Sequence, residues 1–203
     1  FNTSGTYTLK VEVDDLGCGG TKTKAESKLI VYDNTFVLDI VQDKDVICEN
    51  EKVSFTNNTI SSDPLDYTWS VSSMDGVTIS DVKSTAPEIT FTKYGDYVVT
   101  VVMDGKCSDQ TATYNVRVKK DPKVKFETLE TICNNNKFTF DNTKVVYTWY
   151  NMLDTEKEIE WTVTPNTGVT EEDTDKEYPS YTFTETGDYT ITVKVKAMGC
   201  SQA

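Results

Sequence analysis

Histidine is absent from this 203-residue chain, and arginine occurs once, at Arg117. Without histidine there is no Ser-His or Cys-His nucleophile pair, and the commonest zinc ligand is missing. The five cysteines include no Cys-x-x-Cys pair, so a zinc site is a poor explanation for them. Paired carboxylates could in principle serve a glycosidase, but runs of acidic residues usually form solvated loops. We therefore expect a protein that is not an enzyme.

Positive charge is also scarce. The chain has 33 acidic and 20 basic residues, for a net charge of -13. Nucleic acid and anionic membrane surfaces would be repelled by such a surface. No run of 18 apolar residues occurs. We expect no nucleic-acid partner and no direct membrane insertion by this segment.

The chain instead contains a repeat. A Gly-x-Tyr tripeptide begins at Gly5, Gly95 and Gly187, and an alternating stretch follows each one. Phe precedes each Gly by four residues, and Cys follows it 12 or 13 residues later; these residues are Phe1, Phe91 and Phe183, then Cys18, Cys107 and Cys200. A period near 90 residues predicts a string of similar modules.

Each stretch that follows a Gly-x-Tyr alternates with a period of two. In the second copy, one face carries Tyr97, Val99 and Val101. This pattern predicts a strand with one buried face. No segment has a convincing helical period, so the predicted class is all-β. The predicted domains are 1–33, the last two strands of a truncated repeat; 34–120, a complete repeat; and 121–203, a repeat that lacks its last strand.

Turn residues separate further predicted strands. In the second repeat these strands are 36–41, 52–55, 67–71, 77–79, 88–91 and 111–118, and in the third they are 123–126, 137–140, 160–163 and 181–183. From Phe55 to Trp69 is 14 residues, whereas from Phe140 to Trp161 is 21. The third repeat therefore carries an insertion.

The repeats resemble PKD-like domains of large secreted surface proteins of the Bacteroidetes, including gliding-motility adhesins. The resemblance is carried by Gly-x-Tyr, by Trp69-Ser70-Val71-Ser72 and Trp161-Thr162-Val163-Thr164, and by the Gly-Val-Thr turn after each Trp segment. A typical PKD domain has Trp-x-Phe-Gly-Asp-Gly at the Trp segment, so this chain resembles a divergent subgroup. The resemblance implies tandem immunoglobulin-like β-sandwiches in a head-to-tail string, exported to the cell surface.

The cysteines predict disulfides formed in an oxidising compartment. Cys48 and Cys133 lie between the first two strands of their repeats (A and B), while Cys107 and Cys200 lie between the last two (F and G). In an immunoglobulin-like sandwich these two turns lie at opposite ends, roughly 20 Å apart, too far for a disulfide. In a head-to-tail string, however, the A/B turn of one module faces the F/G turn of the next. We predict a Cys48–Cys200 bond across the junction, with Cys48–Cys107 and Cys133–Cys200 as the alternative.

The insertion of the third repeat should lie at the same junction. It carries Tyr147, Trp149 and Tyr150. In one interpretation these rings pack between modules or lie in an exposed hairpin. In the other they form a platform for a sugar or a partner protein.

Acidic loops are the only candidate cation sites. Extracellular modules bind calcium through loop carboxylates, but no EF-hand pattern occurs here. The weak calcium candidates are Asp14, Asp15, Glu171, Glu172, Asp173 and Asp175. We expect no cofactor, with calcium as the one candidate.

The predicted function is that of a structural or adhesive stalk segment of a large bacterial cell-surface adhesin. Its expected partners are adjacent repeats of the same polypeptide, with surface glycans or envelope proteins as further candidates. The alternative is a carbohydrate-binding or substrate-presenting accessory module of a secreted hydrolase. Both place the chain outside the cell.

Overall fold

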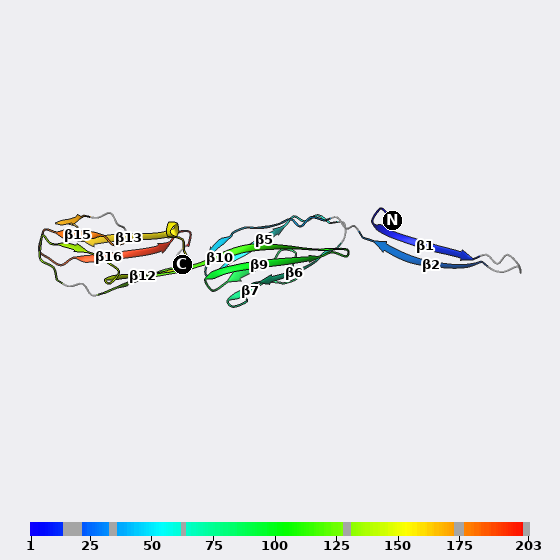
Figure 1. Cartoon of the computed structure of the whole chain (residues 1–203), viewed down its shortest axis with the longest axis horizontal. Coiled ribbons are helices and arrows are strands. Elements are labelled where there is room, and N and C mark those ends of the chain that lie inside the picture. The colour runs from blue at the N-terminus through cyan, green and yellow to red at the C-terminus, as the bar shows by residue number, and fades with distance from the viewer. Residues whose placement is uncertain (14–21, 33–35, 62–63, 128–130, 173–176, 201–203) are drawn as a thin grey trace.

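The computed structural model describes residues 1–13, 22–32, 36–61, 64–127, 131–172 and 177–200. Within these ranges the chain is all-β, apart from one 3-10 turn, η1, at Asp154–Glu156. The strands form a hairpin and two sandwich modules that follow one another along the longest axis (Figure 1). The predicted fold class is confirmed.

The hairpin at the amino-terminal end contains two nine-residue strands, β1 (Gly5–Val13) and β2 (Thr23–Val31). They pair antiparallel in an unbroken register from Gly5 opposite Val31 to Val13 opposite Thr23. Leu9 and Val11 on one face are about half exposed, at 49% and 59%. The hairpin therefore has no packed core of its own.

The second module is a two-layer sandwich. One sheet has the order β3-β5-β8-β7, and in the other β6, β9 and β10 are neighbours, with β4 pairing parallel to β10. The bounds are β3 Ile40–Gln42, β4 Val46–Cys48, β5 Glu51–Asn57, β6 Asp66–Val71, β7 Val77–Ile79, β8 Glu88–Phe91, β9 Gly95–Asp104 and β10 Asp109–Phe126. The core between the sheets includes Val53, Phe91 and Val99, all fully buried. Trp69 is 2% exposed, and its indole N–H donates to the Ser84 carbonyl at 2.8 Å.

The third module has three small sheets, β11-β15-β14, β13-β16 and β12 against the end of β10. The bounds are β11 Lys137–Thr139, β12 Val145–Tyr150, β13 Lys157–Thr164, β14 Val169–Glu171, β15 Ser180–Phe183 and β16 Thr190–Ala197. Its core is smaller and gathers around Phe140, Val145, Tyr181 and Phe183. The strands predicted at 111–118 and 123–126 form one strand, because β10 runs through both.

The Tyr of the Gly-x-Tyr motif makes the same hydrogen bond in all three copies. The Tyr hydroxyl donates to the carbonyl four residues earlier, from Tyr7 to Thr3 at 2.7 Å, from Tyr97 to Lys93 at 3.0 Å and from Tyr189 to Glu185 at 3.2 Å. Such a bond fixes the corner that leads into strand F of an immunoglobulin-like sandwich. Gly95 has φ 150°, a conformation that side chains rarely allow. The repeat seen in the sequence is therefore a repeated corner.

Candidate functional site at the module junction

One strand connects the second and third modules. The 18-residue β10 pairs with β9 as far as Val118 and with β12 from Lys120 onward. The register shifts between Lys120 and Lys123, around Pro122, a residue that cannot donate to a ladder and is confined to edges and bulges. The connection is hydrogen-bonded on both sides of the junction and contains no loop.

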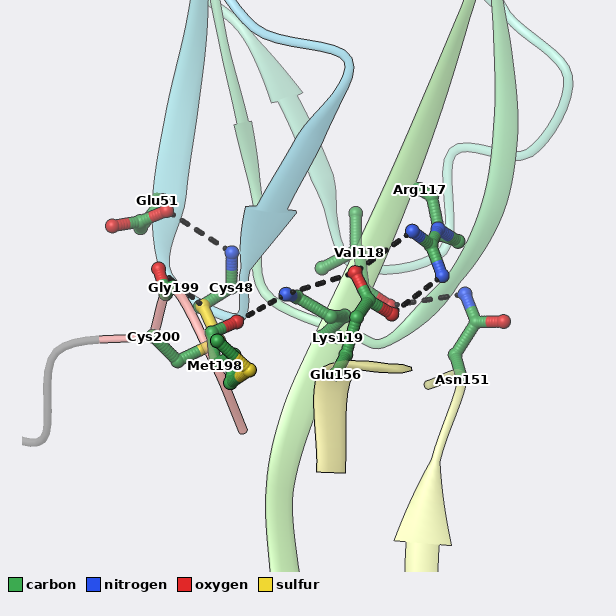
Figure 2. Close-up of a disulfide and its surroundings, with 10 residues drawn as sticks. All are labelled: Cys48, Glu51, Arg117, Val118, Lys119, Asn151, Glu156, Met198, Gly199 and Cys200. Atoms are coloured by element: carbon green, nitrogen blue, oxygen red, sulfur yellow. Dashed lines mark hydrogen bonds and ion pairs between the residues drawn. A yellow bond between two sulfur atoms is a disulfide. The ribbon is translucent and has the colours of Figure 1, made fainter. Parts of the chain in front are cut away.

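A disulfide forms a second connection. Cys48 and Cys200 are bonded, with their Cα atoms 5.7 Å apart and a sequence separation of 152 (Figure 2). Cys48 ends β4, opposite Lys119 of β10, and its N–H donates to the Glu51 carboxylate at 3.0 Å. Parallel pairing with β10 therefore places the Cys48 sulfur at the end of the second module that faces the third.

The other cysteines do not form the alternative bonds. Cys107 and Cys133 are exposed free thiols, so neither within-module pair is present. Cys18 lies outside the described residues. The within-module alternative fails because each pair would have to span the length of a sandwich.

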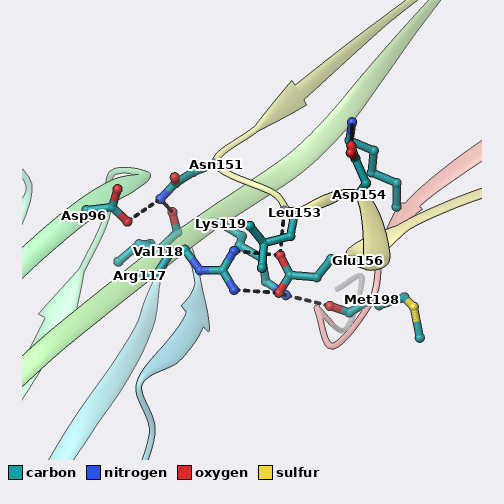
Figure 3. A network of polar contacts seen from close by, with 10 residues as sticks. Asp96, Arg117, Val118, Lys119, Asn151, Leu153, Asp154, Glu156 and Met198 are labelled. Atoms are coloured by element: carbon teal, nitrogen blue, oxygen red, sulfur yellow. Dashed lines mark hydrogen bonds and ion pairs between the residues drawn. The ribbon is translucent and has the colours of Figure 1, made fainter.

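A buried ion network lies beside the disulfide (Figure 2), and Figure 3 shows its polar contacts from close by. Arg117 binds Glu156 through two bonds, at 2.8 and 2.9 Å, and the Lys119 ammonium lies 3.3 Å from the same carboxylate. Lys119 also donates to the Met198 carbonyl at 2.6 Å. The side chains of Arg117, Lys119 and Glu156 are 22%, 5% and 17% exposed. Two cations of the second module are thus held by one carboxylate and one carbonyl of the third.

The local structure around Glu156 aims its carboxylate at the two cations. Glu156 ends η1, and its Oε2 accepts the Leu153 N–H at 2.9 Å. Burial acts to raise the pKa of Glu156, but the hydrogen bonds from Leu153, Arg117 and Lys119 outweigh it and hold the pKa below its usual range. Glu156 is therefore a carboxylate at neutral pH.

Polar and aromatic contacts complete the far side of β10. Asn151, at φ 55°, donates from its amide to Asp96 at 3.1 Å and to the Val118 carbonyl at 3.2 Å. The rings of Tyr94 and Tyr150 lie 5.1 Å apart, one from each module. The Lys120 ammonium lies 5.6 and 5.8 Å from their centroids and is 3.0 Å from Glu49.

The three predicted aromatic residues follow one another along β12, and they have different surroundings. Tyr150 lies at the junction. The rings of Tyr147 and Trp149 stack with their centroids 6.0 Å apart, and the Tyr147 hydroxyl donates to the Glu177 carbonyl at 2.7 Å. The Lys157 ammonium lies 5.6 Å from the Trp149 ring, whose buried indole N–H has no partner among the described residues.

The predicted calcium ligands are mostly outside the described ranges. Asp14, Asp15, Asp173 and Asp175 all belong to segments that the structure does not describe. Glu171 is in β14, and Glu172 accepts a hydrogen bond from the Thr182 hydroxyl. In the described part of the chain, no three His, Cys, Asp or Glu side chains lie close enough to hold a metal ion.

Sequence reasoning missed the ion network and Asn151. One signal was available, because Arg117 is the only arginine in a chain whose other basic residues are all lysine. Arg binds a carboxylate through two parallel bonds, which Lys cannot do. Its partner lies 39 residues away in an insertion, so no local pattern identified it.

Comparison with known proteins supports the fold. Residues 38–118 match the family model of the PKD domain. Two solved fragments of titin, I67-I69 and its E-to-A mutated variant, superpose with TM-scores of 0.51 at 10% and 11% identity, covering 80% of this chain. The chain spans 64% of the length of those fragments. No curated protein sequence matches the chain.

These matches define the fold class as tandem immunoglobulin-like sandwiches, and the PKD-domain match covers residues 38–118 of the second module. At this level of identity the titin fragments show the fold alone. Of the helices described, none is long and apolar enough to cross a membrane.

Proposed function

We propose that this chain is a non-catalytic stalk segment of a bacterial cell-surface adhesin, of the kind found in gliding Bacteroidetes. In this role it works outside the cell and needs no cofactor. Its partners are the neighbouring repeats of the same polypeptide, and the stalk carries an adhesive region toward surface glycans or envelope proteins. The observation that supports this proposal is the junction, where two modules share a strand, a disulfide and a buried ion network.

The disulfide changes how tension passes through the chain. Cys48 and Cys200 enclose nearly all of the second and third modules between them. Tension applied to the two ends of the chain passes directly through the S–S bond and bypasses the residues between the cysteines. Those residues remain folded even when the hydrogen bonds of either module would otherwise break. A segment that carries load at a cell surface benefits from this protection.

The disulfide also restricts bending. A single strand between two modules leaves them free to move, which is the usual condition of linked domains. Here the disulfide lies on one side of β10 and Asn151 on the other (Figure 2). Contacts on both sides of the connecting strand oppose bending in either direction. The junction therefore favours a row of modules of fixed orientation.

Single-molecule pulling between the chain ends tests this proposal. The sequence separation of 152 between the bonded cysteines corresponds to about 500 Å of extended chain, at about 3.4 Å for each residue. We expect this length to appear only after reduction or in Cys48→Ser. Cys107→Ser is the matched control and should behave as the parent chain does. Release of the full length from the oxidised chain would refute the proposed load path.

No observation favours the alternative of a carbohydrate-binding module. A sugar platform needs exposed aromatic faces. The rings of Tyr147 and Tyr150 instead contact Trp149 and Tyr94. Specific glycan binding that is lost in Trp149→Ala would reverse this preference.

A further inference from the structure

Lys119 contacts the main chain beside both cysteines of the disulfide. In the parallel ladder between β4 and β10 it lies opposite Cys48, and its carbonyl accepts the Glu49 N–H at 2.8 Å. Its ammonium donates to the Met198 carbonyl at 2.6 Å, two residues before Cys200. Figure 2 shows this ammonium next to the disulfide. One residue of the second module is therefore bonded, through its backbone and its side chain, to the two segments that carry the bonded sulfurs.

The segment that carries Cys200 is a tight turn. The Cys200 N–H donates to the Ala197 carbonyl at 3.2 Å, and Gly199 has φ 80°. A positive φ at this place in a four-residue turn matches type II, which differs from type I by a flip of the peptide between the two central residues. Here that peptide joins Met198 to Gly199. Its orientation determines whether the Met198 carbonyl faces Lys119.

The same turn brings Cys200 to its partner. The Cys48 sulfur lies 3.9 Å from the Gly199 carbonyl oxygen, so the bonded sulfurs and the turn are in direct contact. Between its two central residues the turn has two possible peptide orientations, and the structure contains the one in which Met198 faces Lys119. A group that stabilises this orientation also stabilises the position of the Cys200 side chain relative to Cys48.

Lys119 and Arg117 make different contacts with the third module. Arg117 binds Glu156 through two bonds, at 2.8 and 2.9 Å. The Lys119 ammonium lies 3.3 Å from that carboxylate but only 2.6 Å from the Met198 carbonyl. The Lys119 side chain is 5% exposed, so water competes little for this bond, and hydrogen bonds from charged donors are among the stronger ones in proteins. Arg117 docks the module, and Lys119 holds the turn.

We propose that Lys119 is the positioning residue that aligns Cys200 with Cys48 for disulfide formation. It holds the peptide between Met198 and Gly199 in the orientation that presents the Cys200 thiol to Cys48. The inference concerns the junction of the proposed function, but it rests on the disulfide and the turn alone. It therefore stands even if pulling shows that the segment carries no load.

The chemical step is thiol–disulfide exchange with a small disulfide such as oxidised glutathione. The Cys48 thiolate attacks glutathione disulfide and releases one glutathione thiolate. The Cys200 thiolate then attacks the Cys48 sulfur of the mixed disulfide and releases the second. Two protein thiols are oxidised, one glutathione disulfide is reduced, and the two protein protons pass to the released thiolates. Lys119 acts at the second attack, which requires Cys200 to lie within bonding reach of Cys48.

The test compares Lys119→Met with the parent chain, each at full length, in a series of glutathione buffers. Methionine keeps an unbranched side chain and removes the ammonium. We expect the equilibrium constant for the Cys48–Cys200 bond to fall about tenfold, the low end for a lost hydrogen bond to a charged group. Lys125→Met is the matched control, because Lys125 lies on the same strand and is 73% exposed, and it should leave the constant unchanged.

Gly199→Ala tests the alignment from the turn itself. A Cβ at Gly199 would lie 3.7 Å from the Lys119 nitrogen, an ordinary contact, so alanine acts through its poor tolerance of positive φ. We expect about a tenfold fall in the constant. The double variant with Lys119→Met should fall less than twofold further, because both changes remove one contact. Gly199 is exposed, so this variant keeps the test valid if Lys119→Met fails to fold.

Hydrogen exchange in the reduced chain separates alignment of the turn from docking of the modules. The Leu153 N–H donates to the Glu156 carboxylate, which Arg117 still holds in Lys119→Met. Exchange of the Leu153 amide should therefore match that of the parent chain. The Cys200 amide, which closes the turn, should exchange at least fivefold faster.

Three results would overturn the proposal. A change below twofold in the constant of either single variant would show that the turn needs no alignment by Lys119. Additive losses in the double variant would show that Lys119 acts elsewhere than through the turn. Faster exchange at Leu153 as well as at Cys200 would show that Lys119 docks the modules and does not align the thiols.

Discussion

Glu156 is the residue on which the junction depends most, because one carboxylate holds two cations of the neighbouring module. Glu156→Gln keeps the size of the side chain and its ability to accept the Leu153 N–H. It leaves the Lys119 ammonium, 5% exposed, with the neutral Met198 carbonyl in place of a counter-charge. A buried charge without a counter-charge is strongly unfavourable.

The magnitude follows from the burial of the three groups. Removing one partner of a fully buried ion pair costs about 3 to 5 kcal/mol, whereas exposed pairs contribute about 1 kcal/mol or less. Arg117 and Glu156 retain 22% and 17% exposure, so water screens part of the loss. We expect docking of the two modules to weaken by about 2 to 3 kcal/mol, between those limits but nearer the buried case.

The Cys48–Cys200 bond itself reports on docking. Its two thiols come from different modules, so the equilibrium constant for forming the bond in a glutathione buffer rises with the docked fraction. A change of about 2 to 3 kcal/mol corresponds to about a 30- to 150-fold decrease in that constant. This equilibrium constant is measured by quenching the protein with acid at a series of glutathione ratios. Mass spectrometry of the cysteine peptides then gives the fraction of bonded chains.

Two controls make the experiment decisive. Glu88→Gln removes the exposed ion pair with Lys52 and should leave the equilibrium constant unchanged. The side chains of Lys52 and Glu88 are 57% and 54% exposed. Adding Lys119→Met to Glu156→Gln should recover part of the loss, because the unpaired ammonium is then gone. A change below twofold in Glu156→Gln would refute the assignment of the ion network as the main docking contact.

Three further outcomes are expected. Because the pKa of Glu156 lies below its usual value, the contribution of Glu156 to folding stability is complete above about pH 4.3 and is lost as pH falls through the folded-state pKa. Urea midpoints should therefore drop less over this acid range in Glu156→Gln than in the parent chain. Tyr97→Phe removes the hydroxyl bond to the Lys93 carbonyl and should cost about 1 kcal/mol in urea unfolding followed by tryptophan fluorescence; an unchanged midpoint would show that the corner is held by its backbone alone. Asn50 has φ 69°, so Asn50→Ala should cost about 1 to 2 kcal/mol while Asn50→Gly stays close to the parent chain; equal losses would point to the side chain instead.

The sandwich strands could be predicted from the sequence because their signals are local. Alternation with a period of two records which side of a strand is buried, and in β9 Tyr97, Val99 and Val101 are all buried. Trp69, in the strand predicted at 67–71, is also buried in the core. The pairing of Cys48 with Cys200 was also within reach, since the direction of successive strands determines the end at which each turn lies.

The contacts that orient the modules could not be predicted in this way. β4 has only three residues, too few for a periodic pattern, and its parallel partner β10 lies about 70 positions later. The insertion was recognised from its length, but not that β12 would pair with β10. Glu156 has no feature that separates it from other acidic residues until η1 and Arg117 are placed. Side-chain partners between modules are determined by three-dimensional packing, and sequence periodicity contains no record of it.

The chemistry of the junction explains why it includes a covalent bond. Its contacts are largely ionic and polar, and such contacts lose much of their attraction to the cost of removing water from charged groups. They determine orientation well, because the two bonds between Arg117 and Glu156 require one geometry. They give limited resistance to sustained separation. The disulfide supplies that resistance, with a chain-entropy contribution on the order of 5 kcal/mol for a closed loop of this length. Loss of Glu156 should therefore broaden the angle between modules while they remain joined, whereas loss of Cys48 should leave the mean angle unchanged and allow the modules to separate under load.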